Sequence, residues 1–154
     1  MTTIESFGLA VELPAGWDGV IFRRDPDPAE RAAGGVDNPV LHAANFSLPA
    51  SRGDFGSGAV EIMGRGGVLV CLVEYNRESA GSALFAREGL PRSVDPDDFA
   101  THTLQRPQAG QGGLQVFFHE GDRAFCLYVV IGSHRRRRVL TPVVNELLRG
   151  LRVV

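Results

Sequence analysis

Residues 113–131 read GLQVFFHEGDRAFCLYVVI, and this stretch decides the fold. Its two halves, 113–119 and 123–131, are rich in β-branched and aromatic residues, and they flank a Glu-Gly-Asp turn at 120–122. Two such runs around a glycine turn are typical of a β-hairpin. Gly132 and Ser133 then interrupt the apolar pattern. The stretch therefore predicts two antiparallel strands of a sheet.

Beyond this hairpin the apolar residues recur at steps of three and four, which indicates an amphipathic helix packed on a sheet. The apolar positions are Val139, Leu140, Val143, Val144, Leu147, Leu148 and Leu151. We expect Val139, Val143, Leu147 and Leu151 to face the sheet, with Arg149 and Arg152 outside.

The rest of the chain predicts further strands. Residues 8–13 (GLAVEL) alternate apolar and small or polar side chains, and 20–24 (VIFRR) are expected to return as their hairpin partner after a turn at 14–19. A third strand is predicted at 40–48. Residues 68–75 (VLVCLVEY) are apolar on both faces, which favours a central strand that is covered on both sides.

Three other segments predict shorter elements. Residues 25–39 are rich in Asp, Pro and Gly and predict a loop with one helical turn near 29–33, while 51–67 predict a brief helix among six glycines. Residues 104–106 have the pattern of an edge strand. We therefore predict one α+β domain over 1–154, with an antiparallel sheet of about five to six strands flanked by helices.

Residues 76–112 form a long connection without a clear pattern, and such segments are often functional. Asp95 followed by Pro96 has the form of a helix start. Phe85, Leu90 and Phe99 are the side chains with which this segment could cover a sheet face as a lid over a pocket.

Composition limits the function classes. The net charge is −2, so bulk charge does not favour nucleic acid or an anionic membrane. All 16 basic residues are arginine, which excludes Schiff-base and lysine-base chemistry. The N-terminus lacks the pattern of an export signal and no run is long enough to cross a membrane, so a cytoplasmic location is expected. Cys71 and Cys126 lie in apolar runs and predict buried, unreactive thiols.

The two ends of the chain carry a family resemblance. A strand that ends in Leu13-Pro14-Ala15-Gly16-Trp17, an antiparallel sheet and a closing helix written PVVNELLRGLR (142–152) resemble the PsbP-like and Mog-like superfamily. That superfamily contains photosystem II extrinsic proteins and a Ran-binding protein. The resemblance implies an α-β-α sandwich and a non-enzymatic assembly, chaperone-like or partner-binding role. Residues 76–112 have no counterpart in it.

Two glycine-rich loops, 53–58 and 64–67, are of the kind that can hold a phosphate in backbone amides. Neither matches a nucleotide-binding motif, so ordinary turns are the favoured interpretation. Asp54, Phe55 and Ser57 are kept as a candidate loop site. The four histidines are scattered without ligand spacing, and we expect no metal, no cofactor and no catalytic residues.

Arg135, Arg136, Arg137 and Arg138 form the strongest remaining feature. Cations at a helix N-terminus oppose the helix dipole, so an acidic partner, a phosphate or RNA could offset their cost through bidentate contacts. The alternative is that Thr141 caps the helix with Pro142 as its first residue, which would leave the arginines on a solvated lead-in.

The sequence therefore favours a cytoplasmic protein-interaction or assembly module that is not an enzyme, with another protein as its partner and a homo-oligomer left open. Two alternatives stay open. One is a small-ligand binder or enzyme with a pocket under 76–112. The other is an anion- or nucleic-acid-binding module that uses the arginine run, although nucleic acid is disfavoured by the net charge.

Overall fold

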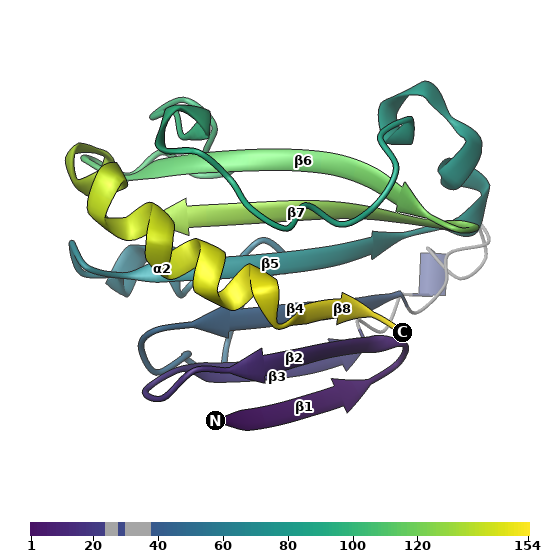
Figure 1. The fold of residues 1–154 in the computed structure, drawn as a ribbon, viewed down its shortest axis with the longest axis horizontal. Helices are drawn as coiled ribbons and strands as arrows, with labels where there is room; N and C mark the ends of the chain where they lie inside the picture. The colour runs from purple at the N-terminus through teal and green to yellow at the C-terminus, as the bar shows by residue number, and fades with distance from the viewer. Residues whose placement is uncertain (24–27, 30–37) are drawn as a thin grey trace.

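The computed structural model describes residues 1–23, 28–29 and 38–154. In this part of the chain, eight strands form two antiparallel sheets, and one long helix follows near the C-terminus (Figure 1). The larger sheet has the order β3 (Asp18–Arg23), β4 (Pro39–Ala44), β5 (Val68–Tyr75), β7 (Arg123–Ile131) and β6 (Gly112–Glu120). The smaller sheet has the order β1 (Thr2–Ser6), β2 (Leu9–Leu13) and β8 (Leu151–Val153).

The hairpin predicted at 113–131 is confirmed. β6 and β7 pair without interruption from Gly112 opposite Ile131 to Glu120 opposite Arg123, so that only Gly121 and Asp122 form the turn. Gly121 has a φ of 59°, which glycine adopts at little cost. β5 is the central strand that its apolar sequence predicts, because β4 and β7 pair with its two edges.

The N-terminal hairpin prediction is wrong in its pairing. β2 pairs with β1, and β3 pairs with β4 in the other sheet. The turn between β1 and β2 consists of Phe7 and Gly8, whose φ angles of 53° and 77° fit a two-residue hairpin turn. β1 has the polar sequence TTIES and is mostly exposed, so it carries no alternation by which a strand is recognised. The single predicted sheet is therefore two sheets.

The C-terminal helix begins earlier than the Thr141 cap would require. A 3-10 turn, η5 (His134–Arg136), leads directly into α2 (Arg137–Arg149), and together they span 16 residues. Thr141 lies inside the helix, where its Oγ1 donates a hydrogen bond to the Arg137 carbonyl at 2.6 Å. The arginine run is therefore part of the helix start and not a lead-in segment.

The buried face of α2 also differs in part from the expected one. Leu140, Val144, Leu147 and Leu148 are buried, Val143 is partly buried, and Val139 is 60% exposed. Consecutive helical residues lie about 100° apart, so the stripe through Leu140 and Val144 leaves Val139 on the solvent side. Leu151 is buried as expected, but it belongs to β8 and lies opposite Val11.

The two faces of the five-stranded sheet are covered differently. One face packs against α2 and the three-stranded sheet, as Figure 1 shows, and this core includes Leu9, Val70, Phe125, Leu127 and Leu147. The second face carries Leu69, Cys71, Cys126, Tyr128 and Val130. Residues 46–63, which contain the 3-10 turn η1 (Val60–Ile62), pack against it. In the described ranges no α-helix covers this second face, so the helices predicted on both sides are found on one.

The segment 76–112 follows the outer edge of β6 and contains three short 3-10 turns, η2 (Arg77–Gly81), η3 (Ala83–Phe85) and η4 (Pro96–Asp98). Asp95 caps η4 as predicted, through a reciprocal capping box with Asp98. The edge strand predicted at 104–106 does not form, and Ala100 instead makes an isolated bridge with Gly113.

The helical turn predicted at 29–33 lies, apart from Ala29, outside the described residues. Among the helices that the structure describes, none has the length and apolarity needed to cross a membrane.

Candidate functional site

A hollow of about 670 Å³ lies at the start of the C-terminal helix, and we name it the arginine hollow. Three separate parts of the chain meet there, which are the turn at 64–67, the end of the segment 76–112 and the start of η5. The hollow is lined by Arg65, Thr101, Ala109, Gly110, Gly132, Ser133, His134, Arg135 and Arg136.

Close backbone packing places the arginines together. Gly132 N–H donates to the Gly67 carbonyl at 2.8 Å, and a Cβ on Gly132 would stand 1.8 Å from the Gly64 carbonyl oxygen. Only glycine permits this approach. The turn that carries Arg65 is thereby held against the residues that precede η5. His134 N–H donates to the Gly110 carbonyl at 2.7 Å. This bond holds the end of the segment 76–112 against the start of η5.

The hollow is strongly electropositive. Arg65, Arg135 and Arg136 are exposed, and in the described ranges none of their guanidinium groups forms an ion pair. None of the carboxylates that the structure describes lines the hollow. α2 begins without a side-chain cap, so the positive end of its dipole adds to the same field. Guanidinium groups in such a setting bind carboxylates or phosphates bidentately.

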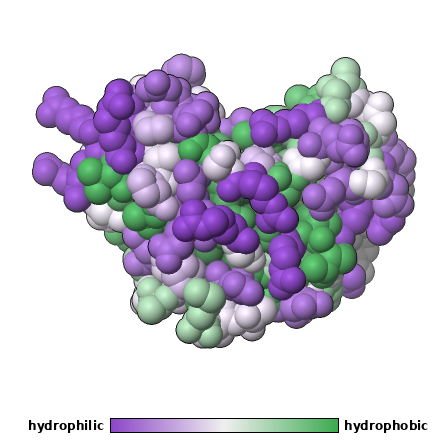
Figure 2. Space-filling view, viewed as in Figure 1, coloured by the Kyte–Doolittle hydropathy of each residue, from purple (hydrophilic) through white to green (hydrophobic). Residues whose placement is uncertain are grey.

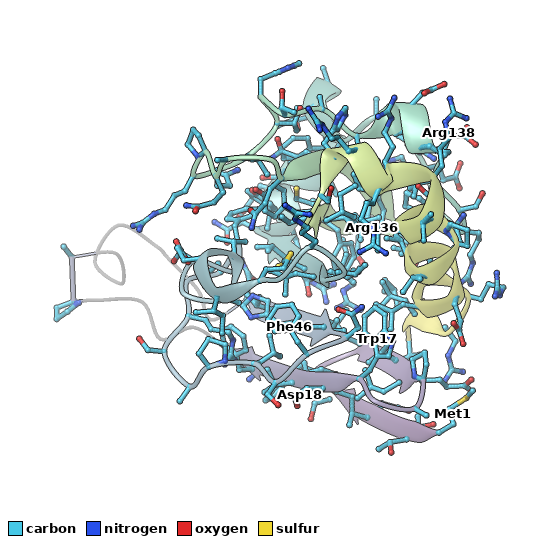
Figure 3. All side chains as sticks on the ribbon, turned by 90° about the vertical axis from the view of Figure 1, so that its left-hand side faces the viewer. Met1, Trp17, Asp18, Phe46, Arg136 and Arg138 are labelled. Atoms are coloured by element: carbon cyan, nitrogen blue, oxygen red, sulfur yellow. The ribbon has the colours of Figure 1, made fainter. Side chains whose placement is uncertain are left out.

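The structure divides the arginine run. Arg135 and Arg136 line the hollow, whereas Arg137 is half-buried and donates to the His134 carbonyl at 3.1 Å. Figure 3 shows Arg138 near the upper rim of the molecule and Arg136 lower, toward the sheets. Sequence reasoning missed Arg65 as a member of the site, although the glycine-rich turn around it was the signal that could have found it.

The candidate loop site at Asp54, Phe55 and Ser57 lies on the second sheet face. These residues line a cavity of about 240 Å³ together with Tyr128, whose ring meets Phe55 edge-on at 5.5 Å. The loop bonds to itself, since Gly53 N–H donates to Ser57 O and Gly56 N–H to Gly53 O. The amides of Gly53 and Gly56 are therefore not available to hold a phosphate.

His42 on β4 supports this loop. It is fully buried, its Nε2 lies 2.7 Å from the Asp54 carbonyl oxygen, and its Nδ1 lies 3.0 Å from Arg52 Nε. The pKa of His42 is lowered to about 4, mainly by burial. The Asp54 hydrogen bond opposes this shift, and the nearby Arg52 charge adds to it. Both ring nitrogens are engaged, so His42 has no free position for proton transfer to a substrate.

The two cysteines behind this loop are buried, as predicted. Burial raises the pKa of the Cys71 thiol well above its ordinary value and raises the pKa of Cys126 to about 11. Both groups are therefore neutral thiols at pH 7, which is the unreactive form.

The proposed lid residues do not meet over one pocket. Phe85 packs on the second sheet face, where its ring lies 5.5 Å from that of Phe117 and 5.2 Å from that of Tyr75. Phe99 and Leu90 lie in the core on the opposite face. The segment 76–112 thus wraps around β6 and contributes side chains to both faces.

A cavity of about 410 Å³ does lie under this segment, next to β6. Its carboxylates, Asp95 and Asp98, accept hydrogen bonds from backbone amides of their own capping box. His119 and Glu120, at the nearby end of β6, are also engaged. His119 Nδ1 lies 2.6 Å from Phe85 O, and Glu120 accepts a hydrogen bond from Leu90 N–H. In the described ranges no three His, Cys, Asp or Glu side chains gather as metal ligands.

No family model, no curated protein and no solved structure matches this chain.

Proposed function

We propose that this protein is a non-enzymatic protein-interaction module of the cytoplasm, and that it binds an acidic segment of a partner protein in the arginine hollow. The observation that carries the proposal is the convergence of Arg65, Arg135 and Arg136 on one concavity without a neutralising carboxylate in its lining. Cations held together in this way repel one another, and a carboxylate-rich partner relieves that repulsion.

An acidic protein segment fits this hollow better than a nucleic acid does. The positive charge is confined to one hollow on a chain whose net charge is −2, whereas nucleic-acid binding proteins usually present an extended basic track. The lining also lacks Phe, Tyr and Trp, on which unpaired bases stack. Among the described residues that line it, only His134 carries a ring, and the Nε2 of that ring lies 3.0 Å from the Phe99 carbonyl oxygen.

Several side chains that could do chemistry are engaged in structural roles, which supports a non-enzymatic function without a cofactor. His42 and the Asp95 and Asp98 carboxylates hold loops in place. Ser57 has no histidine partner among the side-chain hydrogen bonds of the described residues. Nucleophilic catalysis needs such a base beside its nucleophile.

We also propose that the fold is a variant of the PsbP-like and Mog-like sandwich. The C-terminal helix on one face of an antiparallel sheet supports this assignment. The second face departs from an α-β-α arrangement, because residues 46–63 cover it with a 3-10 turn in the described part of the chain.

Binding of a fluorescein-labelled hexaglutamate peptide, followed by fluorescence anisotropy, tests the proposed function. The triple variant Arg65→Gln, Arg135→Gln, Arg136→Gln should weaken binding at least about tenfold, because each lost guanidinium removes a charge-assisted contact. Binding by the wild type should also weaken as NaCl rises from about 50 to about 300 mM.

The matched control is Arg138→Gln, Arg149→Gln, Arg152→Gln, which removes the same charge outside the hollow. It should change the affinity by less than about threefold. Equal losses in both triple variants would mean that only net charge matters, and the proposal would be wrong. An oligothymidine or inorganic phosphate that displaces the peptide at lower concentration than free hexaglutamate would favour the anion-binding alternative.

A further inference from the structure

We propose a second binding site, in which the outer edge of β6 takes an extended peptide of a partner protein as an added strand. β6 is the last strand of the five-stranded sheet, so β7 bonds only one of its two edges. Backbone N–H and C=O groups alternate between the two edges along a strand. The backbone N–H and C=O groups of Gly113 and His119 form hydrogen bonds at the outer edge. The same groups of Gln115 and Phe117, at the alternate positions between them, therefore point to the outer edge as well.

The segment 76–112 bonds this edge at its two ends. At one end, Ala100 and Gly113 exchange two backbone hydrogen bonds of 2.9 Å. At the other end, His119 N–H donates to the Arg87 carbonyl and Gly89 N–H donates to the His119 carbonyl, both at 2.8 Å. Each of the two ends of β6 is thus protected from pairing with another chain.

Between these two points the chain leaves the edge. Leu90, Val94 and Phe99 turn into the core beside α2, and Asn145 of α2 bonds both the N–H and the carbonyl of Val94, at 2.8 and 3.1 Å. Among the described residues, no backbone group bonds the outward N–H and C=O groups of Gln115 and Phe117.

The open edge lies in a hollow and not on a flat surface. The cavity of about 410 Å³ has Leu114, Gln115 and Val116 on one side and Arg87, Asp95 and Asp98 on the other. Figure 2 shows the molecule hollowed at its upper margin, above the middle of β6 as drawn in Figure 1. The opening between Gly113 and His119 spans about 20 Å, which is the length of about six residues of extended strand.

The surroundings indicate the chemistry of that segment. Side chains of an added strand alternate between the two faces of the sheet. On the face that carries the partly exposed ring of Phe117, an apolar residue is favoured. On the other face they meet the exposed carboxylates of Asp95 and Asp98, which keep acceptor sites beyond their capping bonds, and the guanidinium of Arg87. The two carboxylates outnumber this one cation and favour a basic residue. The expected ligand therefore alternates apolar and basic side chains.

The shape of the hollow argues against a second copy of this chain as the source of the added strand, with β6 of one copy paired with β6 of the other. In Figure 2 the molecule rises on both sides of the opening, so the same strand of another copy would be recessed in the same way. Two recessed edges cannot come within the roughly 5 Å that paired strands require. A free extended peptide can enter, which is the usual form of ligand in strand addition.

The probe is the labelled peptide acetyl-Thr-Lys-Val-Lys-Val-Lys-Thr-amide, with binding followed by anisotropy and by backbone amide NMR shifts. We expect saturable binding, with the largest shifts at Gln115 and Phe117. Two control peptides are N-methylated at every second backbone nitrogen, one at the odd and one at the even positions. Both keep the charge of the parent. In either register of the added strand, one of them lacks the N–H groups that would bond to β6. At least one of them should bind about tenfold more weakly.

Gln115→Pro is the matching change in the protein, since it removes the outward N–H without touching the bonds to β7, and edge strands accept proline. It should weaken peptide binding at least about tenfold, whereas Gln115→Val keeps the N–H and should stay within about threefold. A glutamate version of the peptide should bind more weakly than the lysine version because it meets Asp95 and Asp98.

The proposal is overturned if both N-methylated peptides bind as tightly as the parent, a comparison that does not depend on whether Gln115→Pro folds. It is also overturned if the parent peptide does not bind, or if the wild type self-associates and Gln115→Pro abolishes that association. The arginine-hollow variant Arg65→Gln, Arg135→Gln, Arg136→Gln should bind this peptide normally, because the two hollows share no lining residue. The two proposals can therefore fail separately.

Discussion

At the scale of single residues, His42 shows how a buried polar group is satisfied on the second sheet face. Arg52 Nε can only donate a hydrogen bond, so His42 Nδ1 is the acceptor and Nε2 carries the proton that is donated to the Asp54 carbonyl. The ring is therefore neutral in the native state, in agreement with a pKa that burial lowers to about 4. One histidine thus fixes the loop that carries the candidate residues Asp54 and Phe55.

Acid should therefore destabilise the native protein through His42. The unfolded chain binds a proton at this residue near pH 6.5 and the native state only near pH 4, so stability is full above this window and is lost as the pH falls through it. Between these two pH values the free energy of unfolding should fall by roughly 3 kcal/mol more in the wild type than in His42→Gln. Urea melts at several pH values measure this difference.

The exposed His102 provides the control for this measurement. His102→Gln should keep the pH dependence of the wild type, because this change leaves His42 and its contacts with Asp54 and Arg52 in place. Parallel pH profiles for the wild type and His42→Gln would contradict the neutral, buried assignment.

At the scale of elements, α2 is anchored by a narrower stripe than its sequence indicates. Leu147 has no exposed surface and lies in the core, whereas Val139 is 60% exposed although its spacing along the chain also fits an apolar stripe. The sheet contacts only part of the helix circumference. An apolar residue at the margin of the stripe can therefore stay in water, as many surface residues do.

Two alanine substitutions separate these positions. Leu147→Ala should lower the free energy of unfolding by about 2–5 kcal/mol, because the truncated side chain leaves a cavity in the core. Val139→Ala should change it by less than about 0.5 kcal/mol, as exposed substitutions usually do. Denaturant melts of the two variants provide the test, and a larger loss at Val139 would mean that the helix packs by another face.

At the scale of the whole molecule, Arg123 joins parts of the chain that lie far apart in sequence. Its guanidinium contacts the Glu74 carboxylate at 2.7 Å and donates to the Gly8 carbonyl at 3.1 Å. Its Nη1 also lies 3.4 Å from the Val154 carbonyl oxygen. One side chain of the larger sheet therefore holds the turn of the smaller sheet and the last residue of the chain.

Removing this arginine should be costly. Arg123→Ala should lower the free energy of unfolding by about 3–5 kcal/mol, because it leaves the buried Glu74 carboxylate without its counter-charge. Arg77→Ala is the matched control, since the Arg77–Asp122 pair is 65% and 76% exposed and should contribute less than about 1 kcal/mol. Thermal or urea unfolding compares them, and equal losses would show that burial of the Arg123 pair has no energetic effect.

Local patterns in the chain were sufficient for the β6–β7 hairpin, the buried β5 strand, the Asp95 cap and the existence of the C-terminal helix. Each of these depends on residue types at fixed spacing, and spacing along the chain is a local property. The arginine run was visible for the same reason. These features predicted an α+β domain and a basic surface, but not which side chains share a site.

Long-range packing settled the remaining features. The approach of Gly132 to Gly64 brings Arg65 beside Arg135 and Arg136, and the hydrogen bonds of Asn145 draw Val94 away from β6 and open its edge. The polar strand β1 forms because β2 offers it a free edge, not because of its own pattern. Such contacts join residues tens of positions apart, and no local propensity encodes which distant backbone will be their partner.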